Sequence, residues 1–163
     1  MQQLATWSLD DTAYVLRRAA SGDVESIVEL LAADQLGATR ESAPGADLAP
    51  YRQAFAAIDR DPAQLLVVAT TEDDSCVGTM QLSFIPGMAR GGALRAQLEA
   101  VRVAAAHRSR GLGHAMIAWA VTEATERGCA MVQLTTDKSR TDAHRFYELL
   151  GFVASHEGLK LHL

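Results

Sequence analysis

The sequence predicts a mixed α/β fold built on a central sheet that is mostly antiparallel. Three β-rich runs, at 64–71, 76–85 and 94–103, follow one another across short connections, which is typical of an antiparallel meander. A helical pattern over 112–127 separates the third run from a fourth at 130–135, so these two strands should be parallel, with a right-handed crossover. Between them, the stretch VRVAAAHRSRGLGHAM at 101–116 reads as strand, glycine-containing loop and helix.

The remaining elements complete an expected sheet of six to seven strands with about four helices. Further strands are predicted at 13–19, 152–155 and 159–163, and further helices at 24–31, 51–58 and 142–150. Residues 35–50 carry glycine, proline and small side chains and predict a loop. A chain of 163 residues can bury a sizeable core, so we expect one domain over 1–163.

Composition argues against several classes of protein. The net charge of −5 disfavours a nucleic-acid partner. Cys76 and Cys129 lack the spacing of metal ligands, as do the five histidines, so we expect reduced thiols, a cytoplasmic location and no metal. The first residues do not form a signal peptide, and no apolar run approaches the ~18 residues that a membrane helix needs, so no membrane partner is expected.

The loop from Arg108 to Gly113 is suited to hold a phosphate group. Backbone N–H groups at a helix start have no internal partner, glycines allow close approach, and arginines match phosphate oxygens. A nucleotide-triphosphate loop would need Lys and then Ser or Thr after its last glycine, where this chain has His114 and Ala115. A dinucleotide loop would need a small residue at the place of Met116.

Two motifs resemble those of one family. Arg108-Ser109-Arg110-Gly111-Leu112-Gly113 resembles the pyrophosphate loop of the GNAT superfamily of acyl-coenzyme A-dependent N-acetyltransferases, and AHRFYELLGF at 143–152 resembles the family's Phe-Tyr helix before Gly-Phe. The resemblance covers 98–152. It implies the GNAT fold, with the sheet splayed between strands 94–103 and 130–135. It also implies transfer of an acetyl group from acetyl-coenzyme A to a primary amine of a small molecule or peptide, by direct attack in a ternary complex.

The resemblance further implies which residues act in catalysis. Tyr147 would protonate the departing thiolate, and Glu99 would serve as the base that accepts the amine proton. Gln97 lies on the same strand face and could instead orient a water or the amine. A pairing of Glu99 with Arg102 or Arg95 is the ordinary alternative.

For the coenzyme, the resemblance implies contacts from the strand, the loop and the last helix. Arg140 stands where many members carry Asn, and we expect it to reach the coenzyme phosphates with Lys138. Segment 35–60 would shape acceptor specificity, and a homodimer is expected. A non-catalytic coenzyme A-binding sensor is the alternative function. The expected cofactor contacts are Val101, Arg102, Val103, Arg108, Ser109, Arg110, Gly111, Leu112, Gly113, His114, Arg140, Ala143 and Tyr147.

Overall fold

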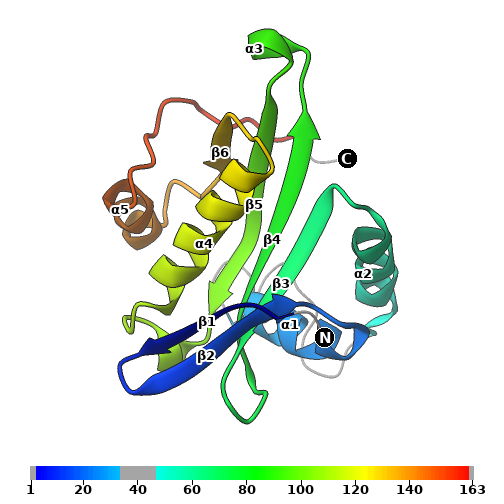
Figure 1. The fold of residues 1–163 in the computed structure, drawn as a ribbon, viewed down its shortest axis with the longest axis vertical. Coiled ribbons are helices and arrows are strands. Elements are labelled where there is room, and N and C mark those ends of the chain that lie inside the picture. Colours follow the sequence, from blue (N-terminus) through cyan, green and yellow to red (C-terminus); the bar gives the residue numbers. More distant parts are fainter. Residues whose placement is uncertain (1–2, 34–46, 162–163) are drawn as a thin grey trace.

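A six-stranded sheet in the order β1-β2-β3-β4-β5-β6 forms the centre of the protein, described here from a computed structural model over residues 3–33 and 47–161 (Figure 1). All neighbouring strands are antiparallel except β5 and β6, which are parallel as the sequence predicts. The strands are β1 (Gln3–Leu9), β2 (Thr12–Arg18), β3 (Gln64–Thr70), β4 (Cys76–Pro86), β5 (Leu94–Val103) and β6 (Met131–Leu134).

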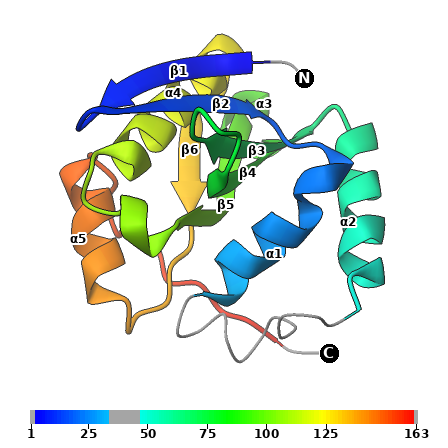
Figure 2. The ribbon, with the colours of Figure 1, turned by 90° about the horizontal axis from the view of Figure 1, so that it is seen from below.

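Helices cover the two faces of the sheet in separate pairs (Figures 1 and 2). On one face α4 and α5 pack over an apolar core that includes Leu82, Leu98 and Met116. On the other, α1 and α2 pack over a smaller cluster around Leu66 and Val68. The helices are α1 (Val24–Ala32), α2 (Ala49–Arg60), the short α3 (Ala89–Gly92), α4 (Leu112–Glu126) and α5 (Thr141–Leu149), with 3-10 turns η1 (Ser21–Asp23) and η2 (Ala105–His107).

The amino-terminal and carboxy-terminal ends differ from the prediction. The sequence analysis placed no strand before residue 13, but β1 pairs with β2 through a tight turn at Asp10 and Asp11, both with positive φ. The closing strands predicted at 152–155 and 159–161 are wrong, because the chain has no regular structure there. Leu159 and Leu161 are 95% and 87% exposed, so no neighbour buries the alternating apolar face that a strand would need.

Other predictions are confirmed or fall partly outside the described residues. The predicted loop at 35–50 lies in large part in the undescribed segment 34–46. Both cysteines are free thiols, as expected. None of the helices within the described ranges is long and apolar enough to span a membrane.

Candidate active site

The parallel strands β5 and β6 separate part-way along their length. Their pairing runs from Arg95 with Met131 to Leu98 with Leu134. Beyond that point β6 has ended, whereas β5 continues to Val103. The expected splay between these two strands is therefore present, and the β6-facing edge of β5 is left without a strand partner after Leu98.

A β-bulge in β5 accompanies the splay. Glu99 pairs with Gln81 and Arg102 pairs with Thr79, so Ala100 and Val101 together oppose the single residue Met80. Ala100 has φ of 52°, in the left-handed region that L-residues rarely adopt. A bulge bends its strand and increases the local twist. The bend thus falls where β5 loses its pairing with β6.

A small hollow of about 70 Å³ lies in the splay. It brings together Glu99 and Tyr147, both predicted from the sequence, although they lie far apart in the chain. It is also lined by four of the predicted cofactor residues, and by Thr135 and Thr136, which were not predicted as site residues although they lie at the end of the predicted strand 130–135 and directly after it. The full lining is Leu98, Glu99, Ala100, Val101, Arg102, Leu134, Thr135, Thr136, Arg140, Ala143 and Tyr147.

Glu99 and Tyr147 approach this hollow from opposite faces of the sheet. Tyr147 belongs to α5 and packs against the core beneath α4. Glu99 is in register with Gln81, whose side chain bonds Gln64 on the face that carries α1 and α2. A molecule placed in the splay could therefore meet a carboxylate from one side and a phenol from the other.

Tyr147 remains a neutral phenol at ordinary pH. Burial raises its pKa above the usual value, and the positive charges of Arg140 and Arg102 only partly offset that effect. Its ring is held edge-on between Phe146 and Phe152, with ring centres 5.1 and 5.7 Å away. The hydroxyl is thus a positioned hydrogen-bond donor.

The predicted phosphate loop lies at the start of α4. The first helical bond runs from the Ala115 N–H to the Gly111 carbonyl, so the N–H groups of residues 111–114 have no helical partner. Ser109 and Gly111 have φ of 59° and 84°, which turns the loop sharply into the helix. Arg110 and His114 are exposed, whereas the Leu112 side chain is fully buried and leaves only its backbone N–H for a ligand.

Two arginines bond carbonyl groups near the end of β5. Arg102 Nη1 donates to the Val101 carbonyl at 2.8 Å, and Arg108 Nε donates to the Val103 carbonyl at 2.9 Å. The sequence analysis assigned both arginines and both valines to the coenzyme without foreseeing these contacts. A ligand that paired with these carbonyls would have to displace the arginines.

Nearby polar side chains have structural partners. His107 Nδ1 lies 2.9 Å from the hydroxyl of the fully buried Tyr14, which fixes η2 to β2. Lys138 forms an ion pair with Glu157 at 3.0 Å. Within the described residues, no group of three or more His, Cys, Asp or Glu side chains could hold a metal ion.

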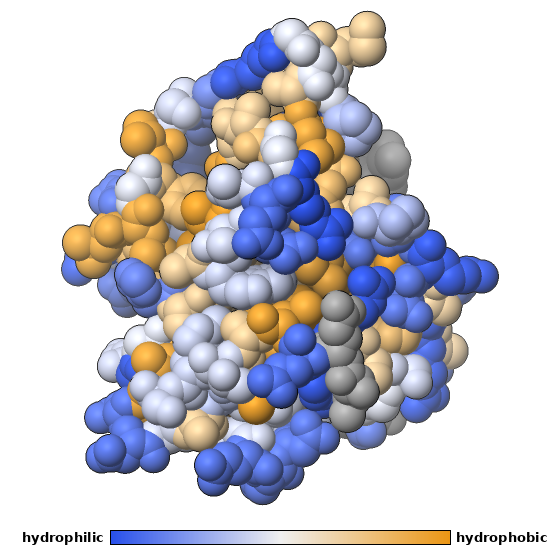
Figure 3. Space-filling model, in the orientation of Figure 1, coloured by the Kyte–Doolittle hydropathy of each residue, from blue (hydrophilic) through white to orange (hydrophobic). Residues whose placement is uncertain are grey.

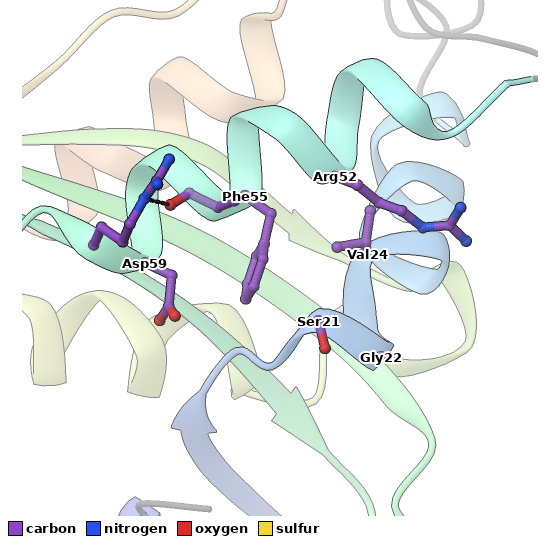
Figure 4. A pocket seen from close by; sticks show the side chains of 8 residues that line it. Ser21, Gly22, Val24, Arg52, Phe55 and Asp59 are labelled. Carbon is purple, nitrogen blue, oxygen red and sulfur yellow. Dashed lines mark hydrogen bonds between the residues drawn. The ribbon is translucent and has the colours of Figure 1, made fainter.

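A second, larger hollow lies between η1, α1 and α2 (Figure 4). Phe55 of α2 points across it toward Ser21, and its volume is about 500 Å³. Two of its charged groups have partners in the protein: Asp59 pairs with Arg18, and Arg60 Nε donates to the Ala56 carbonyl. None of the predicted catalytic or cofactor residues lines it, but part of its lining, on α2, belongs to segment 35–60, which is expected to shape acceptor specificity.

Comparison with known proteins agrees with this geometry. The sequence matches the model of the acetyltransferase (GNAT) family over residues 25–152. A solved structure described as a transcriptional regulator from Bacillus halodurans C-125 is 44% identical, with a TM-score of 0.87, and covers 92% of this chain and 99% of that one. An acetyltransferase from Trypanosoma brucei is 27% identical, with a TM-score of 0.75 and the same coverage, 92% and 99%.

One curated relative matches over a shorter stretch. The aminoalkylphosphonate N-acetyltransferase of Salmonella typhimurium is 41% identical over 49 residues, which is 30% of this chain and 32% of the relative. The match thus spans about a third of that protein's length.

Proposed function

We propose, from the premise that the chain belongs to the acetyltransferase (GNAT) family, that this enzyme acetylates a primary amine of a small molecule or peptide. The acetyl donor is acetyl-coenzyme A, as the family implies. One observation carries the proposal: Glu99 and Tyr147, predicted as base and acid from the sequence, line a single hollow where β5 and β6 separate.

The residues around the splay fit such a donor. The N–H groups of residues 111–114 and the exposed Arg110 offer donors to a pyrophosphate at the positive end of α4. The β6-facing edge of β5 beyond Leu98 can pair with an extended amide-containing arm as an added strand would. Arg108 then exchanges its bond to the Val103 carbonyl for a phosphate oxygen.

The chemistry requires the protonated amine to lose two protons, one before and one after its nitrogen attacks, and the sulfur to gain one. Alkylamines have a pKa of about 10.4, so most of the substrate is protonated near neutral pH. Glu99, directly or through a water oriented by Gln97, accepts the amine proton, and the nitrogen attacks the thioester carbonyl. The carbon–sulfur bond then breaks, and Tyr147 donates a hydrogen bond to the sulfur as negative charge develops on it. The acylated nitrogen loses its second proton to solvent, and the released thiolate takes up a proton from solvent.

In this proposal Arg140 binds the phosphates of the coenzyme. It lines the hollow, and its charge acts on Tyr147. An unchanged KM for acetyl-coenzyme A in Arg140→Ala would remove it from this role.

A second candidate is a coenzyme A-binding sensor without catalysis. The 44% identical structure described as a transcriptional regulator supports this second candidate. The carboxylate and the phenol in one hollow favour the enzyme. The homodimer and the cytoplasmic location expected from the sequence remain predictions, which light scattering and cell fractionation can test.

Thiol release from acetyl-coenzyme A in the presence of a panel of primary amines tests the proposed function. We expect amine-dependent release with at least one acceptor and none when the amine is omitted. Binding of coenzyme A without turnover of any amine would favour the sensor. If coenzyme A produced no thermal stabilisation of the protein, both functions would be wrong.

A further inference from the structure

A row of neutral polar side chains crosses four strands of the sheet beside Glu99. Gln64, Ser83, Gln97 and Gln133 are register partners on β3, β4, β5 and β6. Neighbouring strands lie about 4.8 Å apart, so this row is about 14 Å long, comparable to a small sugar-sized molecule with its substituents. We call these four residues the polar row.

The polar row lies on the face that α1 and α2 only partly cover. On each of the four strands, the residue next to the polar row is a leucine. These leucines are also register partners, and they face the core beneath α4: Leu65, Leu82, Leu98 and Leu134. Because side chains alternate between faces, the polar row points to the opposite side. Gln64, Gln97 and Gln133 are half-buried, and Ser83 is 9% exposed.

Hydrogen bonds within the row leave donors and acceptors unused. Ser83 Oγ donates to Gln64 Oε1 at 2.7 Å, and Gln133 Nε2 donates to Gln97 Oε1 at 2.7 Å. No bond from a described residue reaches Gln133 Oε1 or ends on Ser83 Oγ, and the bond of Gln97 Nε2 to the Leu98 carbonyl is long, at 3.4 Å. None of these unused atoms is among the buried polar atoms that lack a partner in the described residues, so water reaches them. A polar ligand that replaces this water can keep the hydrogen bonds, whereas an apolar one cannot.

The row continues directly into the candidate site. Glu99 lies two residues after Gln97 on the same strand face, which is about 7 Å along β5. In the other direction Arg95 lies two residues before Gln97. Its Nη1 lies only 3.3 Å from the place of a Cβ on Gly87, so the guanidinium is directed toward the β4–β5 connection. Along β5, the surface between these charged groups is therefore neutral.

We infer that the polar row binds the body of the acetyl acceptor and selects a primary amine bearing several hydroxyl groups. This inference rests on the proposed function. The ammonium meets Glu99, and the hydroxyls bond the amides and the serine. An apolar amine would leave these groups desolvated and unpaired, and a linear polyamine would place further ammonium groups over neutral amides instead of carboxylates.

A matched pair of ring amines tests the inference. Glucosamine and cyclohexylamine both present a primary amine on a six-membered ring, and only the first carries hydroxyls. Because neighbouring hydroxyls lower the pKa of an amine, kcat/KM from thiol release is expressed per concentration of free amine. On that basis the wild type should show a value at least about 100-fold higher for glucosamine, consistent with the discrimination that unpaired polar groups produce. Equal values, or a preference for cyclohexylamine, spermidine or a short peptide, would overturn the inference while leaving acetyl transfer intact.

Two variants test whether the polar row causes the preference for glucosamine over cyclohexylamine. Gln133→Leu should lower the glucosamine-to-cyclohexylamine ratio at least tenfold, and Ser83→Ala should lower it in the same direction. Gln3→Leu, the same exchange at an exposed position of β1, serves as control and keeps the ratio. An unchanged ratio in both row variants, with wild-type thermal unfolding and KM for acetyl-coenzyme A, would contradict the assignment. No turnover of any amine would overturn the proposed function, and this inference with it.

Discussion

At the scale of single residues, the environment of Tyr147 decides what its hydroxyl can do. Burial raises its pKa, so full proton transfer to a thiolate, itself derived from a stronger acid, becomes less favourable than for a free phenol. The hydroxyl therefore assists most by donating a hydrogen bond while negative charge develops on sulfur. Its raised pKa also keeps the hydroxyl protonated to a higher pH than that of a free phenol.

We predict that Tyr147→Phe lowers kcat about 100-fold, the usual size of an acid–base contribution. The Kd for coenzyme A should be unchanged, since the ring packing with Phe146 and Phe152 is retained. Thr122→Val, which removes an exposed hydroxyl that bonds only the Ala118 carbonyl within α4, is the control and keeps kcat within about twofold. An unaltered rate in Tyr147→Phe would exclude this hydroxyl from the mechanism.

Glu99→Gln should lower kcat/KM for the amine, by about 100-fold near pH 7. The loss should shrink as pH rises toward the amine pKa of about 10.4, because the free amine then needs no base. In the wild type the rate should keep rising to about pH 10, since the raised pKa of Tyr147 keeps its proton in place. A pH–rate profile of both proteins measures this, and parallel profiles would contradict the role of Glu99.

Resemblance to the family's motifs was enough to select Glu99 and Tyr147 as candidates, and the fold brings both to one hollow, whereas their catalytic roles stay predictions. The sequence could not reveal the left-handed Ala100, since nothing in the letters LEAVRV marks a bulge. Nor can the sequence show that Arg102 and Arg108 bond the Val101 and Val103 carbonyls, because these bonds depend on the side-chain conformations at the end of β5.

At the scale of elements, the start of α4 depends on the backbone of Gly111. This residue caps the helix with φ of 84°, and only the Leu9 side chain lies near the position of a Cβ, at 3.9 Å. Space is thus available for a methyl group, but the left-handed conformation is not favourable for alanine. The strain is about 1–2 kcal/mol.

Gly111→Ala should therefore weaken coenzyme A binding roughly tenfold, which corresponds to about 1.4 kcal/mol, as the loop relaxes away from its anion-binding shape. Gly22→Ala is the matched control, because a Cβ there meets nothing within 4 Å. Isothermal titration calorimetry measures both. Equal Kd values for the two variants would mean that this loop does not hold the coenzyme.

A buried ion pair joins β2 to the turn that precedes α1. Arg17 donates to both carboxylate oxygens of Asp23 at 2.7 and 2.8 Å, and reaches Asp74 at 3.2 Å. Burial favours the neutral acid, but the bonds from Arg17 and from the Ala20 N–H outweigh it, so the pKa of Asp23 falls below its usual value. This contribution to stability is present above the ordinary pKa of about 3.9 and is lost as pH falls further.

Asp23→Asn should lower the free energy of unfolding by about 3 kcal/mol at neutral pH, because it leaves the buried Arg17 without its main partner. The variant should also lose less stability than the wild type when pH falls below about 4. Asp59→Asn, which breaks a half-exposed pair with Arg18, should change stability by less than about 1 kcal/mol. Urea unfolding at several pH values decides between these outcomes.

Element prediction succeeded where burial and hydrophobic pattern agree. The meander and the crossover helix bury their apolar side chains in the core, and α5 packs Phe146 and Tyr147 against it. It failed for residues 152–161, whose alternating pattern has no sheet neighbour to pack against, and for β1, whose pattern is interrupted by polar residues. Tertiary contacts decide both cases.

At the scale of the whole molecule, the sheet separates two kinds of surface. The face beneath α4 and α5 is an apolar core, whereas the other face carries the polar row near β4, β5 and β6. Figure 3 shows a further apolar area over α5 and the chain that follows it, where Leu149 and Val153 are 88% and 80% exposed. The splay between β5 and β6 connects the two faces of the sheet, so that the acetyl donor and the acceptor amine can meet there from opposite sides.

A crystal structure with acetyl-coenzyme A bound tests this arrangement most directly. We expect the pyrophosphate at the N–H groups of residues 111–114, the extended arm along β5 beyond Leu98, and the sulfur within hydrogen-bonding reach of the Tyr147 hydroxyl. A pyrophosphate bound away from α4, or a thioester outside the hollow between β5 and β6, would contradict the account.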